Sequence, residues 1–144
     1  MTRVILGGLL AGLIINISEY VLNMAILGDR MNARLAQMNL APPGGNAIIV
    51  FVALGFLLGI ATIWLYAAIR PRYGAGPKTA MIAGAAVWFL AYFYSSMTSV
   101  AMGMFGRRLI AATLLWGFVE LMIAALAGGY VYQEETAGRG TAKV

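Results

Sequence analysis

Two carboxylates stand inside long apolar stretches of this chain, and their type and position suit them to chemistry. Glu19 lies in the apolar run 4–27, and Glu120 lies in the run 109–132. An ionisable side chain is costly within a membrane span, so it usually faces a bundle interior, a water-filled cavity or a partner. Such a group binds a proton or a cation, or joins helices through hydrogen bonds.

Polar residues share the helical face of each acid. Asn16 precedes Glu19 by three positions and Asn23 follows it by four, so a helix points all three side chains the same way. Thr113 lies seven positions before Glu120 and shares its face. The sequence therefore predicts an intramembrane polar site made of Glu19, Asn16, Asn23, Glu120 and Thr113.

The two acids are expected at similar depths, since their distances from the same ends of their spans differ by roughly 4–5 Å. No Lys or Arg lies within any apolar run to neutralise them. Each acid then carries its own proton, or the two share one, or neighbouring amides and hydroxyls donate hydrogen bonds. Three roles stay open: hydrogen-bonded contact between helices, handling of a proton or cation, and contact with a ligand or partner subunit.

A second polar section, residues 88–99, combines aromatic rings with hydroxyl groups. One interpretation is a cavity that opens outward or binds a quinone-like molecule or a lipid headgroup. The alternative is ordinary packing, because Ser and Thr in membrane helices also bond their own backbone. The residues that would line the cavity are Trp88, Tyr92, Ser95, Ser96 and Ser99.

The composition is that of an integral membrane protein. Hydrophobic residues make up 62% of the 144 residues, charged residues only 10%, and the mean hydropathy is +0.85. The absence of Cys and His removes disulfides, thiolate chemistry and the usual metal and haem ligands. No catalytic constellation is apparent, so we expect no enzyme, no cofactor and no metal.

The net charge of +5 comes from Lys and Arg at the ends of the apolar runs rather than from one basic patch. This placement favours topology and lipid headgroups over a nucleic-acid partner. Six basic residues fall on the side of the termini and four on the other side, which predicts that both termini are cytoplasmic in a bacterial inner membrane.

Four runs are long enough to cross the roughly 30 Å hydrocarbon core of a bilayer. They predict an all-α, antiparallel bundle of four transmembrane helices in one domain, residues 1–133. The helices are expected near 4–27, 46–69, 79–102 and 109–132, followed by a mobile polar tail at 134–144.

The first connection, residues 28–45, is longer than a turn requires. Met31, Leu35 and Met38 recur at helical spacing, which predicts a short amphipathic helix on the outer surface. A lid over a substrate site is the alternative.

Every span carries small residues four apart, a spacing that lets helix backbones approach closely in lipid. Whether these faces close within one chain or between chains stays open. The predicted packing residues are Gly8, Gly12, Gly55, Gly59, Ala80, Gly84, Ala124 and Gly128.

A glutamate in the first of four spans resembles the proton-coupled drug exporters of the small multidrug resistance family. The resemblance covers Glu19 within one helix. This chain is longer, has a larger first connection and carries a second acid at Glu120. We carry none of that family's function over.

The sequence favours a non-enzymatic membrane protein that acts as an accessory or assembly subunit beside larger membrane proteins. The first alternative is a small proton-coupled transporter that uses Glu19 and Glu120. The second is a lipid or quinone binder. The expected partners are membrane lipids and other integral membrane subunits or a second copy of the chain, without nucleic acid.

Overall fold

The computed structural model describes residues 2–137, which form helices and connections without a strand. Four helical stretches are long and apolar enough to cross a membrane: Thr2–Ile26, Gly45–Tyr73, Pro77–Ala101 and Arg107–Tyr132. The prediction of an all-helical chain with four such helices is confirmed.

Two of these stretches change helical type along their length. The first consists of α1 (Thr2–Tyr20) and the π-helix η1 (Val21–Ile26). The third consists of α4 (Pro77–Trp88), the π-helix η2 (Phe89–Phe93) and α5 (Tyr94–Ala101). The remaining helices are α2 (Gly28–Gln37), α3 (Gly45–Tyr73) and α6 (Arg107–Ala137).

Two helices run further than the sequence predicts. Helix α3 continues past residue 69 with Pro71 inside its last turn, and it ends at Gly74, which has a positive φ of 83°. Helix α6 takes up the first four residues assigned to the polar tail and ends at Ala137. The rest of that tail, 138–144, lies outside the described residues.

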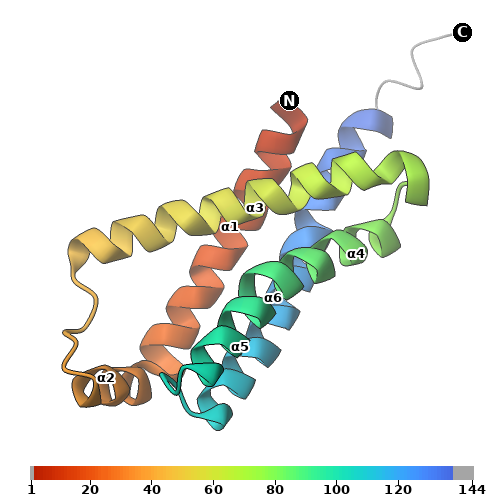
Figure 1. Ribbon diagram of the computed structural model, residues 1–144. Helices are drawn as coiled ribbons and strands as arrows, with labels where there is room; N and C mark the ends of the chain where they lie inside the picture. The colour runs from red at the N-terminus through yellow and green to blue at the C-terminus, as the bar shows by residue number, and fades with distance from the viewer. Residues whose placement is uncertain (1, 138–144) are drawn as a thin grey trace, which may run out of the picture.

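The predicted amphipathic helix in the first connection is present as α2, and none of its residues is buried. Arg34 ties this helix to the connection between α5 and α6. Its guanidinium donates to the backbone oxygens of Met104 and Gly103 over 2.6 and 2.7 Å, and also to Gln37. Helix α2 is therefore held against the end of the helices where η1 and α5 finish (Figure 1).

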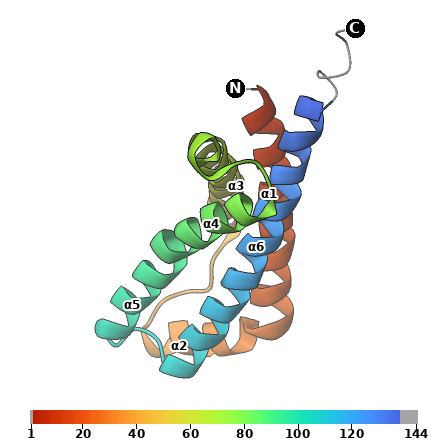
Figure 2. The same cartoon turned by 90° about the vertical axis from the view of Figure 1, so that its right-hand side faces the viewer.

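The helices are not all arranged as a regular antiparallel bundle. Helices α1 and α6 run antiparallel and side by side along much of their length (Figure 2). Helix α3 instead crosses α1 steeply: it lies across the view in Figure 1 and is seen nearly end-on in Figure 2. The predicted antiparallel bundle is thus irregular at α3, which crosses α1 at an angle rather than lying along it.

This crossing is possible because α1 and α3 meet at glycines. A Cβ on Gly59 would overlap the backbone nitrogen of Gly12 and would lie 2.5 Å from the carbonyl oxygen of Gly8. Gly55 leaves room in the same way for the side chain of Asn16. The contact runs from Gly8 to Asn16 on α1, and close approach of the two backbones contributes much of the attraction along it.

The other small residues pack α6 against its neighbours. A Cβ on Gly128 would lie 2.6 Å from the carbonyl oxygen of Gly7 in α1. A Cβ on Gly84 in α4 would lie 3.0 Å from the carbonyl oxygen of Leu121 in α6. Ala80 and Ala124 are buried. The sequence did not decide whether the small-residue faces pack within one chain or between chains. In the structure they pack within one chain.

We expect Gly59→Ala to destabilise the protein by about 1–3 kcal/mol, because the new methyl group must push two backbones apart. Gly45→Ala is the matched control, since nothing lies within 4 Å of a Cβ at that position of the same helix. Thermal unfolding in detergent measures both. Equal unfolding temperatures for the two variants would contradict the close α1–α3 contact.

Candidate functional site

The two acids meet at one hydroxyl group. The hydroxyl oxygen of Tyr92 lies 2.8 Å from Oε1 of Glu19 and 2.8 Å from Oε1 of Glu120. Helix α1 supplies the first acid, η2 supplies the tyrosine and α6 supplies the second acid. The carboxyl groups, 101 positions apart in the sequence, therefore lie on either side of a single oxygen atom.

Hydrogen counting restricts the protonation of this trio. A phenol has one hydrogen to donate, so Tyr92 can donate to only one of the two carboxyl oxygens. The second contact is a hydrogen bond only if that carboxyl carries a proton and donates it to the tyrosine oxygen. With both acids ionised, one carboxylate oxygen would face the lone pairs of the phenol at 2.8 Å. The geometry thus fits one shared proton in addition to that of the phenol.

The site runs from an exposed end to a buried one. Asn23 is exposed, and its side-chain nitrogen donates to Oε2 of Glu19 over 2.7 Å and to the backbone oxygen of Glu19 over 2.9 Å. Glu19 and Tyr92 are half-buried, whereas Glu120 is only 3% exposed. Hydrogen bonds connect the four side chains in a path from the exposed surface at η1 to the buried face of α6.

The inner end of this path has an unpaired atom. Oε2 of Glu120 is buried and has no hydrogen-bond partner within the part of the chain that the structure describes. Ser18 lies beside the same carboxyl group, and its hydroxyl oxygen accepts a hydrogen bond from Trp116 Nε1 over 2.8 Å. A buried polar atom left without a partner is costly, so this oxygen is suited to hold a proton or to receive a ligand.

Ser18 and Trp116 are residues that the sequence analysis missed. Trp116 lies four positions before Glu120, one helical turn away on the same face, and Ser18 adjoins Glu19 in the sequence. Their positions beside the acids were the available signal. Their contact with one another depends on how α1 and α6 pack.

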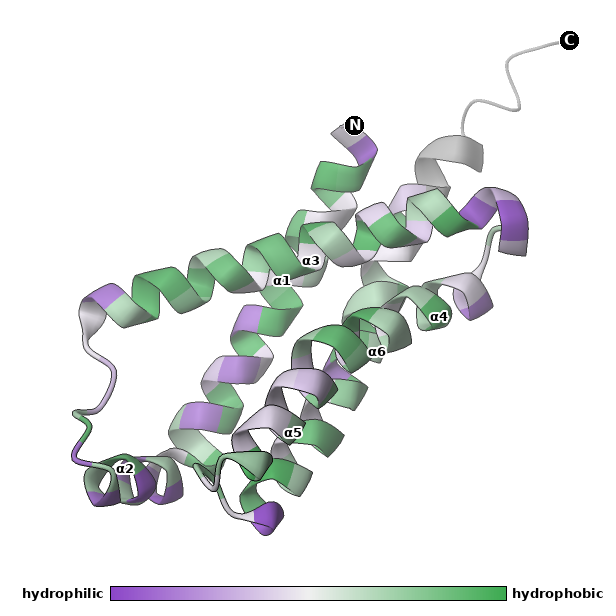
Figure 3. Ribbon diagram, in the orientation of Figure 1, coloured by the Kyte–Doolittle hydropathy of each residue, from purple (hydrophilic) through white to green (hydrophobic). Residues whose placement is uncertain are grey.

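Both π-helical segments lie at this site. Asn23 is within η1 and Tyr92 is within η2. A π-helical turn adds a residue to the helical repeat, which rotates the side chains that follow, and such turns are frequent at functional sites. Figure 3 shows hydrophilic residues within the lower half of α1, surrounded by apolar helix surface.

Two residues of the predicted polar site are engaged elsewhere. Asn16 donates to the backbone oxygens of Gly12 and Val52, over 2.9 and 3.2 Å, and so joins α1 to α3. Thr113 donates to the backbone oxygen of Leu109 in its own helix over 3.1 Å. In the described contacts, both side chains donate to backbone carbonyl oxygens and neither donates to a carboxyl group.

The predicted cavity lining in residues 88–99 is divided among different contacts. Ser95 and Ser99 donate to backbone oxygens of their own helix, and Trp88 Nε1 donates to the backbone oxygen of Leu114 in α6 over 3.0 Å. Ser96 is buried at 8% exposure. Tyr92 alone among the five contacts the acids. A ligand cavity along this section stays a prediction.

The assembled site can bind and transfer a proton, since it contains two carboxyl groups linked by a hydroxyl that both donates and accepts.

No group of three or more His, Cys, Asp and Glu side chains gathers within the described residues. Comparison with protein-family models, curated proteins and solved structures finds no match for this chain.

We expect Tyr92→Phe to lower the free energy of unfolding by about 1–3 kcal/mol, because the bridging hydroxyl is lost while the acids stay in place. Infrared spectroscopy should also show a shift of the carbonyl band of the protonated carboxyl group. Tyr94→Phe is the control, because Tyr94 lies two positions further along the chain and is 70% exposed. Identical spectra and stabilities for the two variants would contradict the bridge.

Proposed function

We propose that this protein is integral to a bacterial inner membrane, with both termini in the cytoplasm, and that it is not an enzyme. Large apolar side chains on the outer faces of the helices support membrane insertion, with Ile49 68%, Leu90 68% and Leu115 73% exposed. In water these faces would form apolar patches far larger than those of soluble monomers. The orientation rests on the distribution of Lys and Arg.

Within this setting we propose a small proton-coupled transporter in which Glu19 and Glu120 are the coupling acids. The observation that carries the proposal is the single hydroxyl of Tyr92 between the two carboxyl groups. Without a basic residue in any of the apolar runs, the natural counter-charge for a second ionised carboxylate is a proton.

Glu19 is the entry point for the proton, because it is half-buried and hydrogen-bonded to the exposed Asn23. A protonated Glu19 donates its hydrogen to the oxygen of Tyr92 while Tyr92 donates its own hydrogen to Glu120. One O–H bond forms and one breaks at the phenol, which stays neutral. The net result is a proton moved from the accessible carboxyl to the buried one.

The opposite end of the site is tightly closed. Ile63, Leu121 and Ala124 have no exposed surface, and the backbones of α1 and α6 touch at Gly7 and Gly128. A transport cycle requires this contact to loosen. Glycine contacts suit such a movement, since they have no interlocking side chains to pull apart.

We expect Glu19→Gln to abolish the coupling between solute and proton. Protein is reconstituted into vesicles with an imposed pH gradient, and a pH-sensitive dye reports collapse of the gradient as amines, carboxylates and inorganic cations are added in turn. A solute that collapses the gradient with wild-type protein should fail with Glu19→Gln and with Glu120→Gln. Asn16→Ala, which removes hydrogen bonds to Gly12 and Val52 and none to the acids, should retain the response.

Collapse of the gradient at the wild-type rate in Glu19→Gln would remove the role of this acid. Failure of every solute with wild-type protein, together with an unchanged carboxyl infrared band in Glu120→Gln, would overturn proton handling altogether.

The second candidate function is an accessory or assembly subunit. It is favoured by residues 45–54, the first ten of α3. None of these residues is buried, and residues 47–54 all have apolar side chains. A larger membrane protein would cover this first third of the helix. Purification from native membranes in mild detergent should then recover a stable partner protein, and migration only as a monomer or homodimer would contradict this function.

A further inference from the structure

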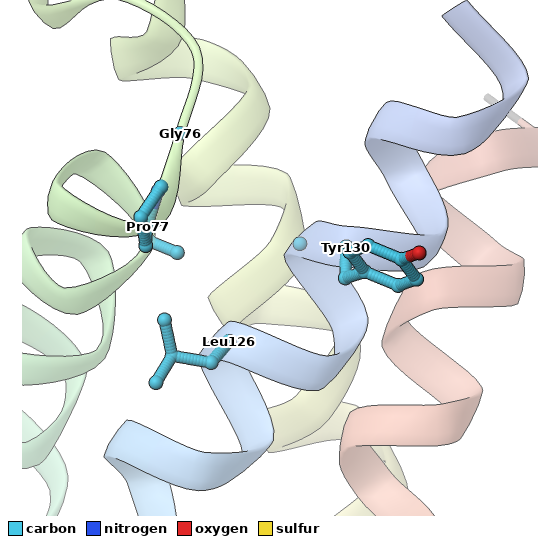
Figure 4. A pocket seen from close by; sticks show the side chains of 6 residues that line it. Gly76, Pro77, Leu126 and Tyr130 are labelled. Carbon is cyan, nitrogen blue, oxygen red and sulfur yellow. The ribbon is translucent and has the colours of Figure 1, made fainter. Parts of the chain in front are cut away.

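Two apolar hollows between helices α4 and α6 are together called the groove. Its first part has a volume of about 270 Å³, between the start of α4 and the later turns of α6 (Figure 4). Its second part, of about 330 Å³, lies further along the same two helices. The lining residues are Gly76, Pro77, Ala80, Leu126, Gly129 and Tyr130 in the first part, and Lys78, Met81, Ile82, Ala85, Phe118 and Met122 in the second.

The lining residues place the two hollows next to one another along α6, and they form a strip in that order. On α6, Phe118 and Met122 line the second part and Leu126 and Tyr130 line the first, each about one turn after the last. On α4 the two linings interleave, with Pro77 and Ala80 in the first part and Lys78 and Met81 in the second. Twelve residues of α6 correspond to about 18 Å, which is close to the roughly 15 Å of one leaflet's hydrocarbon.

The strip has a charged end. Lys78, the second residue of α4, is exposed and lines the second part of the groove. Arg70 and Arg72 lie in the last turn of α3, which the short connection joins to the same end of α4. Figure 3 shows this end as hydrophilic, whereas the adjoining stretches of α4 and α6 are mostly apolar.

We infer that this groove binds an anionic phospholipid, with one acyl chain along α4 and α6 and the phosphate at Lys78. An apolar strip as long as one leaflet fits an acyl chain, and a cationic group at its surface end complements a phosphate. A free phosphate would use only the lysine and leave the apolar strip empty. The site is separate from the acids and does not depend on the proposed transport.

Native mass spectrometry of the purified full chain in detergent tests the groove. Phosphatidylglycerol or phosphatidylcholine with the same acyl chains is added, and the bound fraction is measured. We expect wild-type protein to retain phosphatidylglycerol preferentially and Lys78→Gln to reduce that preference about fivefold, since each basic group near a lipid surface contributes about 1 kcal/mol. Lys78→Arg should keep it.

Arg107→Gln is the matched charge control, because Arg107 begins α6 at the opposite end from the groove's headgroup site. Ala85→Leu tests the apolar part, since it fills the second hollow. It should weaken retention of both lipids while leaving the preference between them unchanged.

Equal retention of the two lipids by wild-type protein would overturn the inference, as would an equal loss of preference in Arg107→Gln and Lys78→Gln. Displacement of bound phosphatidylglycerol by glycerol phosphate would overturn the role of the acyl chain. Unchanged retention of both lipids in Ala85→Leu would do the same.

Discussion

The hydroxyl group of Tyr92 is the point on which the interior of this protein depends. It holds a carboxyl group of α1 and one of α6 at hydrogen-bonding distance, and thereby joins the first, third and fourth long apolar helices. The apolar runs contain no Lys or Arg, so an ion pair with a basic residue of the same spans is not available to these acids. One phenolic hydrogen cannot satisfy two carboxylates, and the geometry therefore fits a further proton on one of the two acids.

The packing around this point explains why the acids can lie where they do. Glycines bring α1 close to α3 at one end, and Gly7 and Gly128 bring α1 close to α6. Toward η1 the packing is looser, and Asn23 reaches the surface there. The result is a buried acid, Glu120, connected to one side of the protein through Glu19 and closed by apolar residues on the other.

Much of this arrangement was predictable from the sequence, because it depends on composition and helical periodicity. The four apolar runs, the shared face of Glu19 and Asn23 and the matching depth of the two acids follow from residue type and spacing alone. The bridge by Tyr92 did not follow, since its hydroxyl could equally have lined a cavity with Ser95 and Ser99. Which of these side chains faces the acids depends on the rotation introduced by η2, and no residue pattern announces a π-helical turn.

The steep crossing of α3 could also not be predicted from the sequence. Small residues four apart permit close contact at several crossing angles, so the spacing of Gly55 and Gly59 indicates proximity but not direction. Asn16 shows the same limit: its position on the face of Glu19 suggested a donor to the acid, yet the nearer carbonyl oxygen of Val52 on the crossing helix takes its hydrogen bond.

Solid-state magnetic resonance tests the central contact most directly. Protein labelled with ¹³C at the glutamate carboxyl and at the tyrosine ring carbon that bears the hydroxyl is reconstituted in lipid, with Glu19→Gln, Glu120→Gln and Tyr92→Phe used for assignment. The account predicts correlations from Tyr92 to both carboxyl carbons, one of them with the chemical shift of a protonated acid. A correlation to only one acid, or two carboxyl groups that are both ionised, would contradict it.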